Sequence, residues 1–283
     1  MKFVPMIKLL EKALAGGYAV PSFCVWNAET MMTVLKSAKR LDSPVILMNG
    51  PGEFPLLAPA VMGKVAYSIP FDNPTPCALH LDHGDSMEQV TACIDAGYTS
   101  VMLDFSARTF NENTTALKEV VRIAHPLGIT VEGEIGSVGK VSDSTLEGGM
   151  ISTLTDPNEA YKYVLATGVD ALAISIGNAH GHYTKLPEFR FDILREVYSR
   201  VKIPLVLHGG SGTPDEDIKK AISLGVAKVN VASELNGAFR DSLKTQWNSG
   251  LNPWTPLAIH EALKQIESVV EKWIHTLGSA GKA

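Results

Sequence analysis

Short apolar runs and amphipathic stretches alternate along almost the whole chain. Runs with the length of buried strands occur at residues 18–25, 44–48, 77–81, 100–103, 129–134, 171–176, 204–207 and 227–231. Apolar residues recur at helical spacing over residues 8–16, 29–40, 86–96, 114–125, 156–167, 190–200 and 214–224, and less regularly over 55–69. Two further helical patterns, at residues 234–247 and 256–277, finish the chain. We expect Asn27 to cap the helix at 29–40 and Pro214 to occupy the first helical position at 214–224.

The strand runs are mostly continuous rather than alternating, which is typical of parallel strands covered on both faces. Eight of them alternating with helices predict an α/β fold, a (β/α)8 TIM barrel with extra C-terminal helices. One such domain accounts for residues 1–283. A doubly wound open sheet is the alternative, but no GxGxxG follows the first strand and the count of eight favours closure.

Composition narrows the class of partner and compartment. The net charge is −5 without a basic run, which argues against nucleic acid as a partner. Cys24, Cys77 and Cys93 form no CxxC and are too few for a disulfide framework, which indicates a reducing compartment. No apolar run approaches the roughly 18 residues of a membrane span, and the N-terminus lacks a long apolar segment. We therefore expect a cytoplasmic protein that does not bind membranes.

Three histidines share one sequence context. His83, His180 and His208 each come at the end of a predicted strand and precede a glycine. A lone histidine at a strand end is more often a hydrogen-bonded structural residue, but three in the same context favour a metal site. Three imidazoles that leave a fourth position open are a catalytic zinc arrangement. Asp82, beside His83, is then a candidate for proton transfer; the alternative is a carboxylate that holds a backbone amide or another histidine.

Glycine and hydroxyl residues follow the seventh and eighth predicted strands. The first group is Gly209, Gly210, Ser211 and Gly212, and the second is Asn230, Val231, Ala232 and Ser233. Glycine lets backbone N–H groups approach an anion, and these two loops are the usual phosphate site of TIM barrels. Zinc beside a phosphate site, with an acid between them, suggests chemistry on the carbonyl of a phosphorylated sugar.

Five motifs resemble the class II, zinc-dependent fructose- and tagatose-bisphosphate aldolases. They are Leu79-His-Leu-Asp-His-Gly, Val131-Glu-Gly-Glu-Ile-Gly, Gly177-x-x-His-Gly, Leu207-His-Gly-Gly-Ser-Gly and Lys228-Val-Asn-Val-Ala-Ser-Glu-Leu. They occur in family order from about residue 16 to the C-terminal helix. The resemblance implies a (β/α)8 aldolase that forms dihydroxyacetone phosphate and an aldehyde, and that assembles as a homodimer or homotetramer.

The resemblance also implies roles for individual residues. It makes His83, His180 and His208 the zinc ligands, and Asp82 the group that exchanges a proton with the C4 hydroxyl or the aldehyde oxygen. It places Asp104 and Glu134 around a second, more buried position of the metal. It assigns Gly181, the loop 209–211 and the segment 230–233 to dihydroxyacetone phosphate, with a monovalent cation, Na+ or K+, assisting there.

Four positions depart from the usual family pattern. Cys24 stands where asparagine is usual, Gly50 where serine or threonine is usual, and Ser142 where a loop glutamate is usual. His260 stands where the C-terminal helix usually carries an arginine or lysine that meets the distal phosphate. Asp143 or Glu147 could replace the glutamate, and His182, Lys185 or Lys140 could meet another anion. These changes predict a non-standard aldehyde half, so that the substrate is a ketose 1-phosphate or an unusual 1,6-bisphosphate.

Three other readings stay open. His180-Gly181-His182 is an HxH, as in barrel hydrolases, but those place it near the first strand, where this chain has Cys24 and Trp26. Lys228 could form a Schiff base, although an ion pair inside the barrel fits better because the histidines would otherwise have no role. A catalytically weakened sugar-phosphate-binding or partner-stabilising subunit is the non-enzyme alternative, which rests on Ser142.

Overall fold

A computed structural model describes residues 3–69, 75–140, 153–181, 187–250 and 253–283. The principal strands are β1 (Val20–Cys24), β2 (Val45–Asn49), β3 (Cys77–Gly84), β4 (Ser100–Leu103), β5 (Thr130–Ile135), β7 (Ala171–Ile174), β9 (Leu205–Leu207) and β10 (Val226–Val231). All pair in parallel and close in the order β1-β10-β9-β7-β5-β4-β3-β2. The predicted TIM barrel is confirmed, and the open-sheet alternative is wrong. Two short strands, β6 (Gly139–Lys140) and β8 (Ala179–His180), pair outside the barrel.

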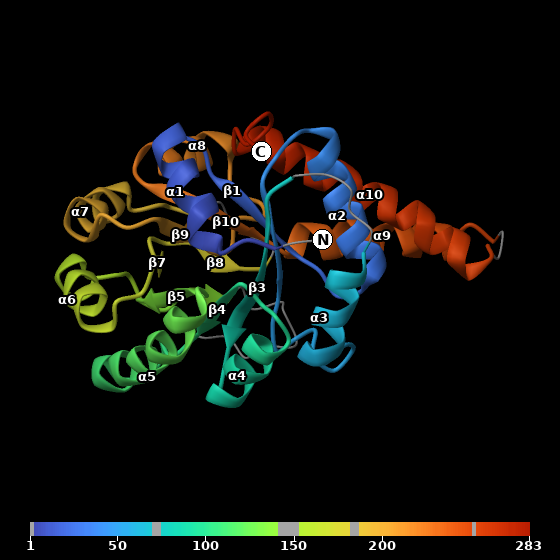
Figure 1. The fold of residues 1–283 in the computed structure, drawn as a ribbon. Coiled ribbons are helices and arrows are strands. Elements are labelled where there is room, and N and C mark those ends of the chain that lie inside the picture. The colour runs from blue at the N-terminus through green and yellow to red at the C-terminus, as the bar shows by residue number, and fades with distance from the viewer. Residues whose placement is uncertain (1–2, 70–74, 141–152, 182–186, 251–252) are drawn as a thin grey trace.

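Helices surround the barrel (Figure 1). They are α1 (Met6–Gly16), α2 (Ala28–Arg40), α3 (Pro59–Ser68), α4 (Met87–Asp95), α5 (Phe110–Ala124), α6 (Pro157–Thr167), α7 (Phe191–Val201), α8 (Asp215–Ser223), α9 (Ser233–Asn248) and α10 (Thr255–Thr276), and a 3-10 turn covers His125–Leu127. Within the described ranges, no helix has both the length and the apolar character to cross a bilayer.

Helix ends show where the sequence pattern was sufficient and where it was not. Asn27 caps α2 as predicted, and its side chain accepts a hydrogen bond from the Thr30 N–H at 2.9 Å. Pro214 was predicted at the first helical position, but it is the residue before the helix. Helix α5 begins earlier than predicted because Thr109 and Glu112 form a capping box, and Phe110 is the only apolar residue of its first turn.

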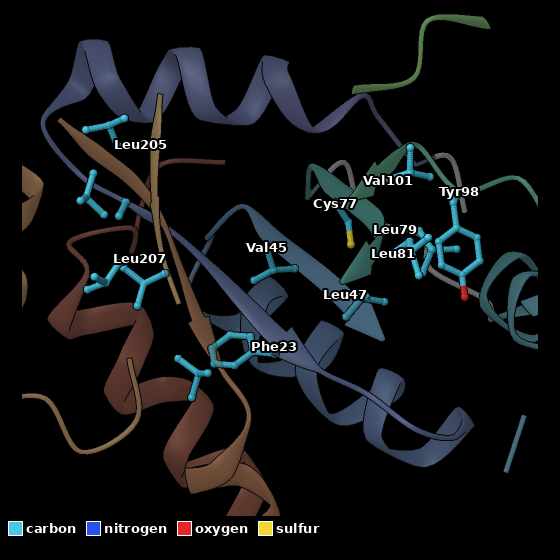
Figure 2. Close-up of a cluster of buried hydrophobic side chains, with 14 of the residues drawn as sticks. Phe23, Val45, Leu47, Cys77, Leu79, Leu81, Tyr98, Val101, Leu205 and Leu207 are labelled. Atoms are coloured by element: carbon cyan, nitrogen blue, oxygen red, sulfur yellow. The ribbon is translucent and has the colours of Figure 1, made fainter. Parts of the chain in front are cut away.

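Alternate strand residues pack against the helices. Figure 2 shows part of this outer core, where Phe23, Leu47, Leu79 and Leu207 project from four different strands. These side chains are fully buried, which is why the strands read as apolar runs. The intervening residues face the barrel interior.

Helix α1 closes the end of the barrel where the strands begin. The Val4 N–H donates to the Cys77 carbonyl at 2.9 Å, and the Ile7 N–H donates to Thr130 Oγ1 at 3.0 Å. Residues of α1 and of the barrel interior form one buried apolar cluster, which we call the apolar layer. Its members are Met6, Leu9, Leu10, Ala13, Tyr18, Val20, Ile46, Ala78, Ala171, Ala173, Val206 and Ala227. The polar side chains lie at the opposite end of the barrel, where the strands finish.

Candidate active site

Three histidines lie together where the barrel strands end. His83 lies near the end of β3, His180 in β8 after β7, and His208 directly after β9. The ring centroid of His83 is 4.4 Å from that of His208 and 4.8 Å from that of His180. One ring nitrogen from each histidine lies within 4.8 Å of the other two. The barrel therefore brings the predicted zinc ligands into one group, at the face where TIM barrels hold their active sites.

The backbone at His83 is bent to present the ring. His83 has φ +47°, in the left-handed region, and the register between β3 and β4 shifts between Leu81 and Gly84. A side chain at Gly84 would lie 2.7 Å from the Met102 carbonyl oxygen, so only glycine lets β3 approach β4 there. Such irregularities are common beside active sites, where they redirect a side chain.

The hydrogen bonds of two of these rings fit a metal. His83 Nδ1 lies 2.7 Å from Asp104 Oδ2, and His208 Nε2 lies 2.9 Å from Glu132 Oε1. The opposite nitrogens, His83 Nε2 and His208 Nδ1, are buried and have no hydrogen-bond partner among the described residues. A carboxylate behind each ring fixes the tautomer that leaves the other nitrogen as a lone-pair donor. This is the arrangement expected of zinc ligands.

A second group of side chains could also hold a metal. His83, Asp104 and Glu134 bring a ligand atom each to within 4.8 Å of one another. Glu134 Oε2 is buried without a hydrogen bond among the described residues and lies 3.1 Å from His208 Nδ1. Both acids thus stand where the resemblance places an alternative metal position.

The charges of the site favour a cation. Burial alone would lower the pKa of His83, but the carboxylates of Asp82, Asp104 and Glu134 raise it to about 10. Burial and the neighbouring His83 also act to lower the pKa of His208, yet Glu132 and Glu134 raise it. Carboxylates that would hold an imidazolium without metal equally stabilise a divalent cation between neutral imidazoles.

Asp82 lies between this group and β10. Its Oδ1 accepts a hydrogen bond from Asn230 Nδ2 at 2.8 Å and lies 3.8 Å from His80 Nε2. Burial would raise the pKa of Asp82, but the charges of His83, His208 and Lys228 lower it to about 2. Asp82 is therefore a carboxylate at neutral pH, able to accept a proton.

Two buried charged residues form a chain of contacts that ends at His208. Glu132 places Oε1 against His208 Nε2 and Oε2 at 2.8 Å from Lys228 Nζ. Lys228 and Glu132 are both fully buried. The predicted ion pair of Lys228 inside the barrel is confirmed, and its ammonium group is committed to Glu132 rather than presented as a nucleophile.

His80 extends this chain toward the apolar layer. Its Nε2 lies 3.4 Å from Lys228 Nζ, and its Nδ1 lies 2.8 Å from Ser100 Oγ. Burial, followed by the charge of Lys228, lowers the pKa of His80 to about 3, so the ring is neutral. We did not predict roles for His80 or Glu132. We call Glu132 and Lys228, together with the neutral His80 beside them, the charged layer.

The two glycine and hydroxyl loops lie side by side. The Gly210 N–H donates to the Asn230 carbonyl at 3.1 Å, which joins the segments after β9 and β10. Gly209 has φ +65°, and a side chain there would lie 2.1 Å from the Ala179 carbonyl oxygen. Ser211 is buried, and its Oγ accepts a hydrogen bond from the Glu234 N–H at 3.1 Å.

The same place is the start of helix α9. Ser233 is its first residue, and Ala232, the residue before it, provides no side-chain cap. The remaining predicted residues surround this point, with Val231 buried and Gly181 half-buried at φ +105°. Backbone N–H groups at a helix N-terminus favour an anion. The geometry is compatible with the predicted phosphate site.

The sequence profile of the family described as fructose-bisphosphate aldolase class II matches residues 4–282. The chain belongs to that family. A solved structure of the YdjI aldolase from Escherichia coli K12 is 35% identical, with 100% of both chains covered and a TM-score of 0.87. A putative fructose-1,6-bisphosphate aldolase from Coccidioides immitis is 28% identical, with 98% of this chain and 96% of that chain covered and a TM-score of 0.88.

The fold recurs in a more distant structure. Fructose-bisphosphate aldolase from Campylobacter jejuni is 23% identical, with 98% of this chain and 95% of that chain covered and a TM-score of 0.84. Membership of the class II aldolase family makes the protein an aldehyde-lyase, which breaks and forms carbon–carbon bonds, and zinc and a sugar phosphate suit this family.

Two of the departures from the usual family pattern meet in this class II aldolase. Cys24, at the end of β1, pairs with Met48 of β2, and Gly50 directly follows β2. A side chain at Gly50 would lie 2.2 Å from the Asp82 carbonyl oxygen, so serine or threonine would require the strands to separate. The Glu53 side chain lies against both positions, and sequence reasoning missed it.

The structure says less about the two other departures from the family pattern, at His260 and Ser142. His260 lies in a groove of about 520 Å³ whose described lining comes from α2 and the α10 region. Ser142 lies outside the described residues, as do Asp143 and Glu147, which could replace the loop glutamate, and His182 and Lys185, which could meet another anion. Lys140, the third residue that could meet an anion, is described only as part of the backbone of β6.

Proposed function

We propose that this class II aldolase is zinc-dependent and reversibly cleaves a phosphorylated ketose into dihydroxyacetone phosphate and a non-standard aldehyde. The unpartnered nitrogens of His83 and His208, each backed by a carboxylate on the other side of the ring, carry the proposal. With His180 they would hold the zinc, and the group of His83, Asp104 and Glu134 would offer a second position. Bound zinc supplies a Lewis acid that polarises the ketose carbonyl.

Asp82 moves the proton at C4. As a carboxylate it accepts the proton of the C4 hydroxyl in the cleavage direction, and it returns that proton to the aldehyde oxygen in condensation. The bond between C3 and C4 breaks, C4 becomes the aldehyde carbon, and the electron pair left on C3 takes up a proton to give dihydroxyacetone phosphate. The hydrogen bond from Asn230 holds the carboxylate in place for this transfer.

The phosphate binds at the joined loops. Gly181, Gly209, Gly210 and Ser211 on one side, and Asn230, Val231, Ala232 and Ser233 on the other, would surround it with backbone N–H groups and hydroxyls. A monovalent cation, Na+ or K+, would assist there by adding positive charge. The apposition of Gly210 and Asn230 and the start of α9 at Ser233 support this assignment.

Proton exchange on dihydroxyacetone phosphate tests the proposal without any aldehyde. NMR in deuterated water should show loss of one hydroxymethyl proton in the presence of the zinc-loaded enzyme, and a chelator should abolish the exchange. Zinc bound without exchange would contradict the proposal and would instead fit a sugar-phosphate-binding subunit.

We further propose a cytoplasmic homodimer or homotetramer, as in the family. Trp254 and Leu257, beside the start of α10, are 74% and 63% exposed, and such large apolar side chains suit a subunit contact. Light scattering coupled to size-exclusion chromatography should give a mass of two or four subunits, and a monomer would exclude the assembly.

A further inference from the structure

A third group of potential metal ligands lies inside the barrel. His80, Asp82 and Glu132 each bring one ligand atom to within 4.8 Å of the other two. His80 Nε2 lies 3.8 Å from Asp82 Oδ1 and 3.7 Å from Glu132 Oε2. An imidazole nitrogen with two carboxylate oxygens is a set of donors that binds zinc. By donor chemistry alone, this group is as suited to a divalent cation as the two groups that contain His83.

The Lys228 side chain already supplies a positive charge to this group. Its Nζ donates to Glu132 Oε2 at 2.8 Å and lies 3.4 Å from His80 Nε2. These are two of the atoms that would bind the metal, and Lys228 is fully buried against them. A fixed ammonium charge and a divalent cation repel each other strongly away from water, so they cannot share these contacts.

Lys228 reaches the group from another part of the barrel wall. It lies on β10, whose neighbours are β1 and β9, whereas His80 and Glu132 lie on β3 and β5. A buried ion pair contributes little net stability compared with an apolar pair of the same volume. The position of this ammonium group is therefore better explained by what it keeps out than by the stability of the fold.

A metal ion in this group would disturb two side chains that the neighbouring site uses. Glu132 contacts His208 through Oε1, at 2.9 Å, while its Oε2 belongs to the third group. Asp82 would become a metal ligand through the Oδ1 that lies near His80. A carboxylate beside a divalent cation holds a proton more weakly, so Asp82 would be a poorer base.

We propose that Lys228 excludes metal from this third group, so that zinc is confined to the two groups that contain His83. Lys228 is then a specificity-determining residue for the position of the metal, and not a catalytic residue. We take the role of Asp82 from the proposed function, on which this inference rests in that respect. Removal of the ammonium group should open the third group to a divalent cation, because all three donors remain.

The amount of bound zinc tests this role. Equilibrium dialysis at saturating zinc, followed by elemental analysis, should find about one more zinc ion per chain in Lys228→Ala than in the wild type. Zinc should also raise the melting temperature of Lys228→Ala more than that of the wild type, since the additional ion binds the folded chain. Lys228→Ala combined with His80→Leu lacks one donor and should bind no additional ion. Lys219→Ala, which removes an exposed lysine on α8, is the matched control and should bind as the wild type does.

Several outcomes would overturn the role of Lys228. Equal amounts of zinc in Lys228→Ala and the wild type would do so, as would an additional ion that persists when His80→Leu is added. A wild type that loses a zinc ion in His80→Leu alone would show that Lys228 excludes nothing. A Lys228→Ala chain that does not fold in zinc would also contradict the role, because the ion should replace the ammonium charge. A wild type that binds no zinc would remove the proposed function, but the difference between it and Lys228→Ala would still decide the role of Lys228.

Discussion

The two ends of the barrel interior are equally dry but opposite in chemistry. In the apolar layer, Ile46, Ala78 and Val206 face α1 and are fully buried. In the charged layer, a few residues further along the strands, Glu132 and Lys228 are just as fully buried. Burial alone therefore does not separate a region that stabilises the fold from one that prepares a site.

The two layers differ in what their burial contributes to the stability of the fold. Apolar side chains gain stability when they leave water, whereas a buried ion pair is often no more stable than an apolar pair of the same volume. The charged layer is therefore explained by its contacts rather than by stability. Glu132 accepts from His208 Nε2 and so fixes the tautomer in which Nδ1 carries the lone pair, and Lys228 neutralises the charge of Glu132. We interpret it as the support of the metal site.

Removing the buried cation should give the largest effect. Lys228→Met leaves the fully buried Glu132 without its ammonium partner, so we expect the free energy of unfolding to fall by about 3–5 kcal/mol. Urea denaturation of the metal-free protein measures it. Adding Glu132→Gln to this variant removes the unpaired charge and should recover most of the loss. A double variant no more stable than Lys228→Met would mean that packing, not charge, is responsible.

The apolar layer should behave in the opposite way. Leu10→Ala empties a fully buried site on α1, and we expect a loss of about 2–5 kcal/mol in the free energy of unfolding. The zinc affinity of the folded protein should stay unchanged because Leu10 does not belong to the charged layer. A chelator competition that showed weaker zinc binding in Leu10→Ala would break the distinction between the two layers.

Glu132→Gln should weaken metal binding, in addition to the stability lost because Lys228 is left without its carboxylate partner. A glutamine amide can donate to His208 Nε2, which moves the ring proton to Nδ1 and removes the lone pair aimed at the metal. We expect zinc affinity to fall about 10–100-fold, measured by competition with a chromophoric chelator. Glu119→Gln, an exposed change on α5, serves as the control. Equal affinities in the wild type and Glu132→Gln would show that the tautomer of His208 is set by other contacts.

Acidification should reveal His80 through stability. The folded pKa of His80 is about 3, below the ordinary histidine value of 6.5, so the unfolded chain binds a proton that the folded chain rejects. Stability is therefore lost as the pH falls from about 6.5 toward 3, by up to about 1.4 kcal/mol per pH unit for this one group. Comparing metal-free wild type and His80→Asn between pH 7 and 5.5 isolates this contribution. Parallel curves would contradict it.

The sequence was most informative where a functional residue interrupts an apolar run. His83, His180 and His208 each follow such a run and precede glycine, so their grouping was predictable once eight strands indicated a closed barrel. His80 and Glu132 were missed because each lies inside an apolar run that we interpreted as continuous core. The spacing of two that links His80 to Asp82, and Glu132 to Glu134, would have placed them on the interior face.

Other features depend on contacts that no local pattern encodes. Glu53 lies in a turn without periodicity, so no sequence pattern predicts that its carboxyl group accepts a hydrogen bond from Gly50, which packs on the Asp82 backbone. The two-residue pairing of β6 with β8 joins loops that are far apart in the chain. Pairings this short have no propensity signal of their own because tertiary packing decides them.

The position of α1 has a consequence for the order in which the protein is made. The ribosome releases Leu10 and Ala13 early, but their partners Val206 and Ala227 emerge near the end of synthesis. At 5–20 residues per second, the apolar face of α1 waits roughly 10–40 s before the barrel can close over it. During that interval the apolar face of α1 is exposed in the nascent chain. We therefore expect α1 to be a segment that a chaperone binds.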